Sequence, residues 1–277
     1  YQWFGEPENR NLIKQLRREG VNFESSIYQS AGAAGPLAGK ALVLTGTLPN
    51  LKRHEAAAKI EAAGGKVVGS VSRKTNYVVA GEGSPVLLVH GLGASMVVWR
   101  ENVADLAQRF KVYVIDLPGH GDTDKPDIEY GAESTVEYIR KFVEFLGVGK
   151  IALMGNSLGG GLVLMTALMH PEIVSKLALV SSGSLGREVS IWLRLPSLPV
   201  IGEIVTNGPV DNTEFMLQKA FFDKSLATKE LVAELRRTNS LPGGRKAVLK
   251  IIRNFISLLG VKRQYVRARD VGRLEMP

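Results

Sequence analysis

One serine of this sequence is flanked in the way that a catalytic nucleophile requires. Ser157 has a glycine two residues away on either side, Gly155 and Gly159, and it closely follows the apolar segment 151–154. A serine on a tight turn from a strand into a helix exposes its hydroxyl, and a side chain at either glycine would clash within the turn. The pattern therefore predicts a nucleophile elbow. The plainer alternative is a glycine-rich surface turn that contains a serine.

A second glycine turn can supply the electrostatic half of such a site. The segment 90–95 (His-Gly-Leu-Gly-Ala-Ser) directly follows the apolar run 86–89, and Gly91 lies at its start. A turn at this place points a backbone N–H into the site, and the amide of Leu158 provides a second donor to a developing oxyanion. We interpret His90 as a turn histidine that is satisfied by backbone groups, and not as the catalytic base.

Three carboxylates occur close together in the loop that follows the apolar segment 112–115. Asp116, Asp122 and Asp124 offer oxygen ligands of the kind that cations prefer, but their spacing lacks the pattern of a calcium loop. The sequence also has no cysteine, which excludes disulfides and thiolate metal sites. We therefore expect neither a metal nor another cofactor.

The elements that would position these groups alternate between strand and helix from residue 83 onward, which is typical of a parallel sheet with crossover helices. Beyond residue 187 the strands cease, and apolar helical periodicity continues to about residue 269, as expected of a helical cap. We divide this part into a core, 83–186, and a cap that leads toward further strands, 187–277. The expected strands are 86–89, 112–115, 151–154 and 177–180, and the expected helices are 102–108, 135–146 and 159–169.

The first 82 residues differ in texture from the rest. Residues 1–24 have the spacing of one amphipathic helix, and residues 25–36 are rich in Gly, Ala and Ser, as a linker would be. Residues 37–82 alternate short strands with one helix. The expected strands are 40–46, 66–71 and 76–80, and the expected helix is 54–63.

A resemblance to a known family rests on motifs in this first part, at 4–10, 37–40, 44–48, 60–66 and 72–82. Residues 37–82 are similar to part of the BRCT domain of bacterial NAD-dependent DNA ligases, and residues 1–24 look like the end of the preceding helix-hairpin-helix region. The resemblance implies weak contact with DNA or protein. It stops early, because Glu82 leads directly into the apolar run 86–89 where a BRCT domain would continue with a helix.

Three motifs of the second part, 90–95, 116–126 and 155–159, resemble in order and spacing those of the α/β-hydrolases that include esterases and C–C hydrolases. The resemblance covers about residues 76–277, so the chain looks like a chimera of two families. It implies that Ser157 attacks an acyl carbon, while a histidine acts as general base and a carboxylate orients that histidine.

The same resemblance assigns further roles. It makes the amide of Leu92 the first oxyanion donor, beside that of Leu158, and it makes the loop 116–126 mainly structural. The substrate it implies is a small apolar ester or ketone. Apolar residues of the cap would then line an acyl pocket, although plain helix packing explains most of them equally well.

The sequence departs from the family pattern at the base and the acid, which follow the serine along the chain in these hydrolases. After Ser157 the only histidine is His170, in a His-Pro pair that ends the helix begun at the elbow. The chain ends at Pro277, where family members begin the strand that leads to the catalytic Asp. We therefore expect an α/β fold with an incomplete α/β-hydrolase parallel sheet and a helical cap, preceded by a partial BRCT α/β unit. We also expect this chain to be inactive or nearly so.

The join between the two parts falls in residues 76–83, which suit a strand in either family. Recombination between two genes, or a misjoined sequence, would leave such a shared segment. Three interpretations remain open: a serine hydrolase of the α/β fold, a DNA- or protein-binding module of the BRCT type, and a chimera without a selected function.

The net charge of +8 is mild once it is divided between the parts. Residues 1–82 hold 11 Lys and Arg against 7 Asp and Glu, and residues 83–277 hold 24 against 20. The excess concentrates after Arg236, where a solvated helical face explains it better than a phosphate-binding stripe. No stretch has the apolar length of a membrane span, and the N-terminus is not signal-like, so we expect a cytoplasmic protein without a membrane partner.

Overall fold

The computed structural model describes residues 41–43, 53–64, 66–68, 77–207 and 213–276. The helix predicted over 1–24 and the linker predicted over 25–36 lie outside these residues. In the first part, strand β1 (Ala41–Val43) pairs in parallel with strand β2 (Lys66–Val68), and helix α3 (Arg53–Ala62) lies between them in the chain. The strand-helix-strand order predicted for this part is therefore present.

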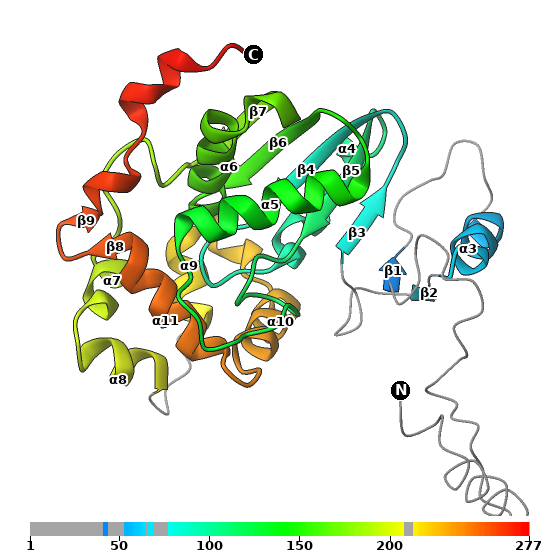
Figure 1. Ribbon diagram of the computed structural model, residues 1–277. Helices are drawn as coiled ribbons and strands as arrows, with labels where there is room; N and C mark the ends of the chain where they lie inside the picture. The colour runs from blue at the N-terminus through cyan, green and yellow to red at the C-terminus, as the bar shows by residue number, and fades with distance from the viewer. Residues whose placement is uncertain (1–40, 44–52, 65, 69–76, 208–212, 277) are drawn as a thin grey trace, which may run out of the picture.

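The second part is built on a five-stranded sheet in the order β3-β5-β4-β6-β7 (Figure 1). Four strands run parallel, and β3 runs antiparallel to its neighbour β5. Among the described strands β7 pairs only with β6, so it forms an edge of the sheet. The strands are β3 (Tyr77–Ala80), β4 (Ser84–Val89), β5 (Phe110–Ile115), β6 (Ile151–Asn156) and β7 (Val174–Val180).

Strand β3 comes from the segment 76–83 that suits both families, and it belongs to this sheet. It pairs with β5 along its whole length. The chain then turns at Gly81, with φ +73°, where a Cβ atom would overlap the carbonyl oxygen of Ala107. A glycine is required there because of both the positive φ and the close backbone approach. The shared segment thus serves as the antiparallel edge strand of the hydrolase-like sheet.

Helices cover both faces of the sheet, because successive side chains of a strand point to opposite faces. Leu87 of β4 packs in the core that includes α5 (Ala132–Leu146) and α6 (Leu158–Met169), whereas its neighbour Leu88 packs in the core that includes α4 (Arg100–Leu106). Both leucines are fully buried. The three helices lie within three residues of their predicted bounds.

The chain after β7 is mainly helical, as predicted for a cap, and its α-helices lie beyond the carboxyl ends of the sheet strands (Figure 1). None of the helices in the described ranges is both long and apolar enough to cross a membrane. The cap helices are α7 (Ile191–Arg194), α8 (Ile201–Asn207), α9 (Thr213–Ala220), α10 (Lys229–Asn239) and α11 (Gly244–Phe255).

The prediction that strands cease between 187 and 269 is wrong at one place. A hairpin of two short strands, β8 (Ile256–Ser257) and β9 (Gly260–Val261), follows α11. Each strand has two residues, which is too few to show the alternation that identifies a strand in a sequence. Gly260 has φ +97°, and a Cβ atom there would overlap the carbonyl oxygen of Arg187. The hairpin therefore packs tightly against the chain that leaves the sheet.

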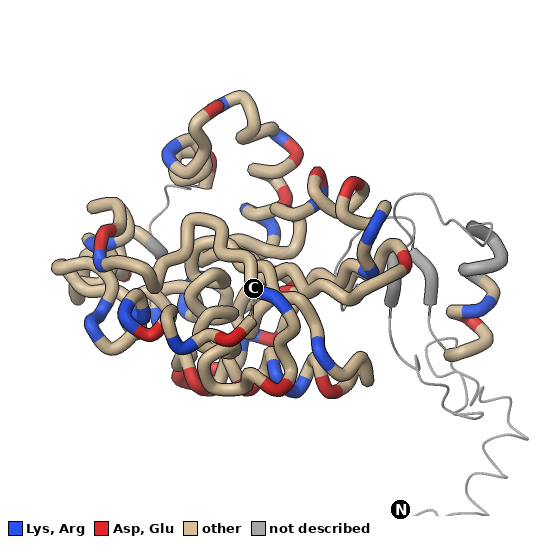
Figure 2. The backbone as a smooth tube through the Cα atoms, turned by 90° about the horizontal axis from the view of Figure 1, so that it is seen from above, with Lys and Arg blue, Asp and Glu red and all other residues tan. Residues whose placement is uncertain are grey.

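Basic residues of α11 lie beside carboxylates. Lys246 and Lys250 lie 2.6 and 2.8 Å from the carboxylate of Asp127, and Arg253 lies 2.7 Å from that of Glu203. Figure 2 shows acidic and basic residues interspersed over the described chain. This pairing favours a solvated helical face over a phosphate-binding stripe.

The burial of the sheet yields a first prediction. Leu87→Ala removes a fully buried side chain and leaves a cavity between β4 and the helices, so the free energy of unfolding should fall by about 2–5 kcal/mol. Leu259→Ala is the matched control, because Leu259 is 72% exposed and its loss should change stability by less than about 0.5 kcal/mol. Urea titration of both variants measures the difference. Equal effects would contradict the placement of Leu87 in the core.

Candidate active site

The turn between β6 and α6 holds Ser157 in a strained backbone conformation. Ser157 has φ 52° and ψ −115°, and a residue other than glycine in such a region carries about 1–3 kcal/mol of strain. Backbone hydrogen bonds hold it there. Its N–H donates to the carbonyl of Val180 (3.0 Å), and its own carbonyl accepts from the N–H groups of Gly161 (3.1 Å) and Gly183 (3.0 Å). This is the geometry that the sequence predicts for an elbow.

The glycines around Ser157 allow separate backbone segments to meet. A Cβ atom on Gly155 would overlap the carbonyl group of Gly159, and one on Gly159 would overlap two carbonyl oxygens at the end of β4. A Cβ atom on Gly91 would lie 3.2 Å from the Cβ of Ser157. The structure thus places all three predicted glycines where a side chain would open the turn or separate β4 from α6.

A pocket lies beside Ser157, and the predicted oxyanion donors Leu92 and Leu158 both line it. The pocket holds about 530 Å³ of space, part of it open to solvent. Among the described residues, no charged side chain lines this pocket, and its polar groups besides Ser157 are those of Ser184 and Tyr265. The apolar wall includes Val189, Leu193, Ile251, Phe255, Ile256 and Val261.

Sequence reasoning missed the part of this wall that comes from the end of the chain. Ile256 and Val261 belong to the β8–β9 hairpin, and Tyr265 follows in a short 3-10 helix (Arg263–Tyr265), where its ring lies 4.6 Å from that of Phe255. About a hundred positions separate these residues from Ser157. The apolar periodicity of α11 is a usable signal for one side of the pocket, but no motif marks the hairpin.

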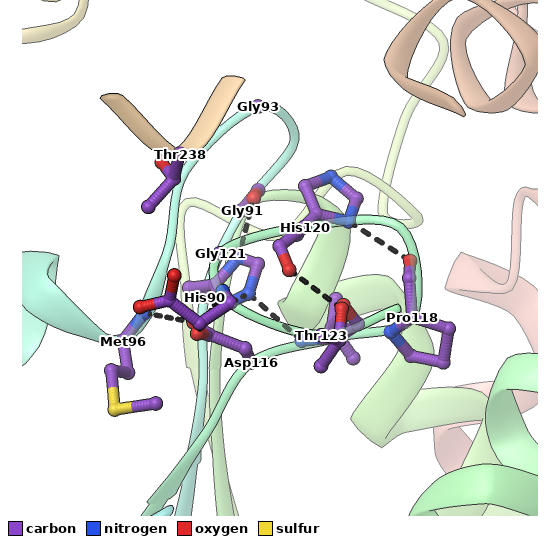
Figure 3. A network of polar contacts seen from close by, with 12 residues as sticks. His90, Gly91, Gly93, Met96, Asp116, Pro118, His120, Gly121, Thr123 and Thr238 are labelled. Atoms are coloured by element: carbon purple, nitrogen blue, oxygen red, sulfur yellow. Dashed lines mark hydrogen bonds and ion pairs between the residues drawn. The ribbon is translucent and has the colours of Figure 1, made fainter. Parts of the chain in front are cut away.

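The rings of His90, at the start of the segment 90–95, and of His120, in the loop after β5, lie side by side with centroids 5.1 Å apart (Figure 3). His90 donates from Nδ1 to the carbonyl of Gly91 (2.8 Å) and accepts the N–H of Leu117 at Nε2 (3.0 Å). Backbone groups therefore satisfy both of its nitrogens, as predicted. His120 donates from Nδ1 to the carbonyl of Pro118 (3.2 Å), while its Nε2 is buried without a hydrogen-bond partner among the described residues.

Asp116 ties the loop after β5 to the segment 90–95 and the short helix that follows it (Figure 3). Its carboxylate accepts the N–H of Met96 (2.6 Å) and the N–H of Asp122 (2.9 Å). Nε2 of His90 lies 3.8 Å from Asp116, but that nitrogen already accepts a hydrogen bond, so the imidazole is neutral and the contact is no salt bridge. The structural role implied for this loop by resemblance agrees with these contacts.

Burial shifts the protonation of all three groups. Desolvation lowers the pKa of His90 to about 4. Desolvation, together with the nearby His90, lowers the pKa of His120 to about 3. Desolvation also raises the pKa of Asp116 to about 6, against the backbone hydrogen bonds that favour its charged form. Neither histidine is positively charged at neutral pH, and neither lines the pocket.

The remaining histidine of the second part is also remote from Ser157. His170 follows the last residue of α6, and its Nδ1 lies 3.4 Å from the carboxylate of Glu172. Because a helix rises about 1.5 Å per residue, it lies roughly 20 Å along the helix axis from Ser157. His54 belongs to α3 in the first part. The three histidines of the second part therefore provide no base at the pocket.

The close backbone approach at the elbow predicts that one added methyl group at Gly159 lowers the stability of the fold. Gly159→Ala would force its Cβ into the carbonyl oxygens at the end of β4, and overpacking of this kind should lower the free energy of unfolding by about 1–3 kcal/mol. Gly272→Ala is the control, because no atom lies within 4 Å of a Cβ at that position. Parallel urea titrations test the pair. An unchanged stability in Gly159→Ala would show that the two segments do not touch.

The buried histidines predict acid sensitivity. Their pKa values are lowered in the folded state. Below pH 6.5 the unfolded chain therefore binds two protons that the folded chain does not bind, and the free energy of unfolding decreases as the pH is lowered. Asp116 has a raised pKa of about 6, so the folded chain binds a proton there that the unfolded chain does not, and this offsets the effect of one histidine on stability. Between pH 6 and pH 4 the three groups together should cost about 1.4 kcal/mol per pH unit.

Replacing one histidine tests this dependence. His120→Phe keeps a ring in place and removes one titrating group, so the acid-side loss contributed by these groups should flatten by about 1.4 kcal/mol per pH unit. Urea titrations from pH 7 to pH 4 on both proteins give the slopes. Parallel slopes would mean that His120 is protonated in the fold.

Comparisons with known proteins agree with this geometry. A family model for the alpha/beta hydrolase fold matches residues 84–199. An uncharacterized protein of Mycobacterium tuberculosis is 39% identical over 127 residues, which are 46% of this chain and 37% of that protein. The 2-hydroxy-6-oxo-6-(2'-aminophenyl)hexa-2,4-dienoic acid hydrolase of Metapseudomonas resinovorans is 38% identical over 125 residues, 44% of this chain and 43% of the hydrolase. The chain thus spans less than half the length of these relatives.

Solved structures support the same fold. A meta-cleavage product hydrolase from Pseudomonas fluorescens IP01 aligns with a TM-score of 0.57 at 26% identity, covering 72% of each chain. A Burkholderia cenocepacia protein, Cfl2, aligns with a TM-score of 0.63 at 23% identity, which shows the fold alone.

The first part matches a different family. A family model for the BRCA1 C Terminus (BRCT) domain matches residues 33–102, which overlap the start of the hydrolase match. A DNA ligase of Synechococcus sp. (strain CC9605) is 50% identical over 104 residues, 34% of this chain and 15% of the ligase. The chain therefore joins a BRCT segment similar to those of DNA ligases to a segment of the α/β-hydrolase fold.

Proposed function

We propose that the second part carries the nucleophile and oxyanion half of a serine hydrolase site, which acts on an ester or on a C–C bond next to a carbonyl. Ser157 is the nucleophile in this proposal, and the amides of Leu92 and Leu158 stabilise the oxyanion. The observation that carries it is the strained conformation of Ser157 at the edge of an apolar pocket that both leucines line. The likeness to a curated hydrolase supports it.

The pocket lining indicates a neutral, apolar substrate. The relative from Metapseudomonas resinovorans is named for a dienoic acid, which carries a carboxylate at neutral pH. Burying such a group is unfavourable without a cation or hydrogen-bond donors. No charged side chain of the described residues lines this pocket, and Tyr265 and Ser184 supply its hydroxyl groups besides Ser157. We therefore assign a small apolar ester or ketone to this chain.

Among the described residues, no histidine lines the pocket beside Ser157 as a general base would. A serine alcohol is almost wholly protonated at neutral pH, and loss of a triad member removes about 10⁴ to 10⁶ in turnover. The oxyanion donors and the pocket alone retain roughly 10³–10⁴ over the reaction in water. The 277-residue chain should therefore react at Ser157 slowly, and should become faster when a base is supplied from solution.

Chemical rescue tests this proposal. Hydrolysis of p-nitrophenyl butyrate should be weak, and added imidazole should accelerate it in the unmodified chain but not in Ser157→Ala, after subtraction of the free-solution rate. A fluorophosphonate should label Ser157 in preference to Ser184, read by peptide mass spectrometry. Fast turnover without imidazole that Ser157→Ala abolishes would refute the missing base, and absence of any Ser157-dependent reaction would refute the nucleophile.

A second candidate function rests on the first part. The BRCT match and the ligase relatives favour a module that contacts DNA or protein. Fluorescence anisotropy with duplex DNA discriminates between the two functions, since phosphate binding weakens steeply as salt rises.

We also place the protein in the cytoplasm, because a chain without cysteine depends on no disulfide.

A further inference from the structure

A side chain of the cap reaches the middle of the segment 90–95. Asn239 is the last residue of α10, and its Nδ2 donates a hydrogen bond of 2.9 Å to the carbonyl oxygen of Gly93. Gly93 lies one residue beyond Leu92, whose amide is the first oxyanion donor of the proposed site. A cap residue distant in sequence is thus in direct contact with this loop.

The hydrogen bond from Asn239 adds to the contacts of the loop's centre, where the side chain of Leu92 packs against the apolar core. The two ends of the loop are fixed, by His90 to the backbone of Leu117 and by the N–H of Met96 to Asp116. Gly93 between them has φ +67°, and no heavy atom lies within 4 Å of a Cβ placed there. Among the described residues, Asn239 is the one group outside the loop that donates a hydrogen bond to residues 92–94.

The end of α10 is itself anchored to the core. Arg237 makes two hydrogen bonds, of 2.8 and 2.7 Å, to the carboxylate of Asp122, whose side chain is 6% exposed. The backbone N–H of Asp122 in turn donates to Asp116, which holds Met96 at the end of the loop. Charged pairs with this bidentate geometry are directional and strong. Asn239 therefore extends from a fixed point.

We propose that Asn239 is a positioning residue, which fixes the direction of the Leu92 amide by holding the carbonyl of Gly93. The carbonyl oxygen of Gly93 and the amide of Leu92 belong to one tight turn, in which the N–H of Ala94 also donates to the carbonyl of Gly91 (3.3 Å). Rotation of the turn moves both groups together. The oxyanion hole is then formed only while the cap is docked, so cap docking and transition-state stabilisation are coupled. This role rests on the proposed function.

Hydrogen exchange tests the geometric part of the proposal without any catalysis. Asn239→Ala should raise the exchange rates of the amides of residues 92–94 about tenfold, the effect of losing one hydrogen bond. Asn239→Asp has the same shape but cannot donate, and it should do the same. Asn254→Ala is the matched control, because Asn254 is a half-buried residue of α11 whose side chain bonds only to Glu129, at 3.5 Å, among the described hydrogen bonds. Unchanged exchange in both Asn239 variants would overturn the proposal.

Reaction at Ser157 tests the catalytic part. With imidazole present, the maximal rate of Ser157 labelling by a fluorophosphonate should fall about tenfold in Asn239→Ala, a fraction of the effect of losing an oxyanion donor outright. The reagent concentration at half-maximal rate should not change, because the pocket is intact. A rise in that concentration alone would show a role in binding and would refute positioning.

The two proposals fail in distinguishable ways. If the unmodified chain shows no Ser157-dependent reaction, the serine hydrolase function is wrong, while the exchange of residues 92–94 still reports whether Asn239 fixes the loop. If Ser157 reacts but the Asn239 variants label at the unmodified rate, the positioning role is wrong and the hydrolase function stands. Circular dichroism melting of each variant separates these outcomes from unfolding.

Discussion

Close backbone contact between the end of β4 and the start of α6 is the constraint on which the rest of this structure depends. Gly159 lies against carbonyl oxygens of β4, and Gly155 lies against the carbonyl group of Gly159, so neither position has room for a Cβ atom. The contact forces Ser157 into a conformation that a serine adopts only under tertiary constraint. It also brings Leu92 to the same pocket as the serine. Ser157 and the loop that contains Leu92 are thus positioned by one packing contact.

Hydrogen bonds from side chains to the backbone hold together the loops behind this contact. His90 uses both ring nitrogens on backbone groups, and Asp116 accepts two backbone N–H groups, so each imposes a fixed geometry on a glycine-rich segment. Protonation of either imidazole is unfavourable here, because both rings are fully buried and Nε2 of His90 already accepts a hydrogen bond. The neutral rings therefore fix the conformation of these loops, but they make the folded state less stable at acid pH.

Most of the sheet and the elbow could be predicted from the sequence, whereas the pocket could not. The strands from Ser84 to Val180 are apolar runs with turn residues at their ends, and Ser157 has a glycine two residues away on either side. Both features depend on residues that are close together in the sequence, so the sequence alone predicts them. The pocket wall comes from Ile256, Val261 and Tyr265, whose contacts with the serine depend on how the cap folds back. Asn239 was missed for the same reason, because a single amide that donates to a distant carbonyl leaves no pattern in a sequence.

The join between the two parts is tolerated because β3 is an edge strand. An edge strand pairs through its backbone on one side only, so its sequence needs only apolar residues followed by a turn. Tyr77, Val78 and Ala80 are buried in the sheet, and Gly81 begins the turn. A segment of BRCT-like sequence meets that demand. On the other side of the join, β1 and β2 form a two-stranded sheet. A pair of strands is only marginally stable unless it packs against further elements, so we expect this part to be the less stable one. The five-stranded sheet that holds Ser157 therefore begins at β3, inside the segment that both families share.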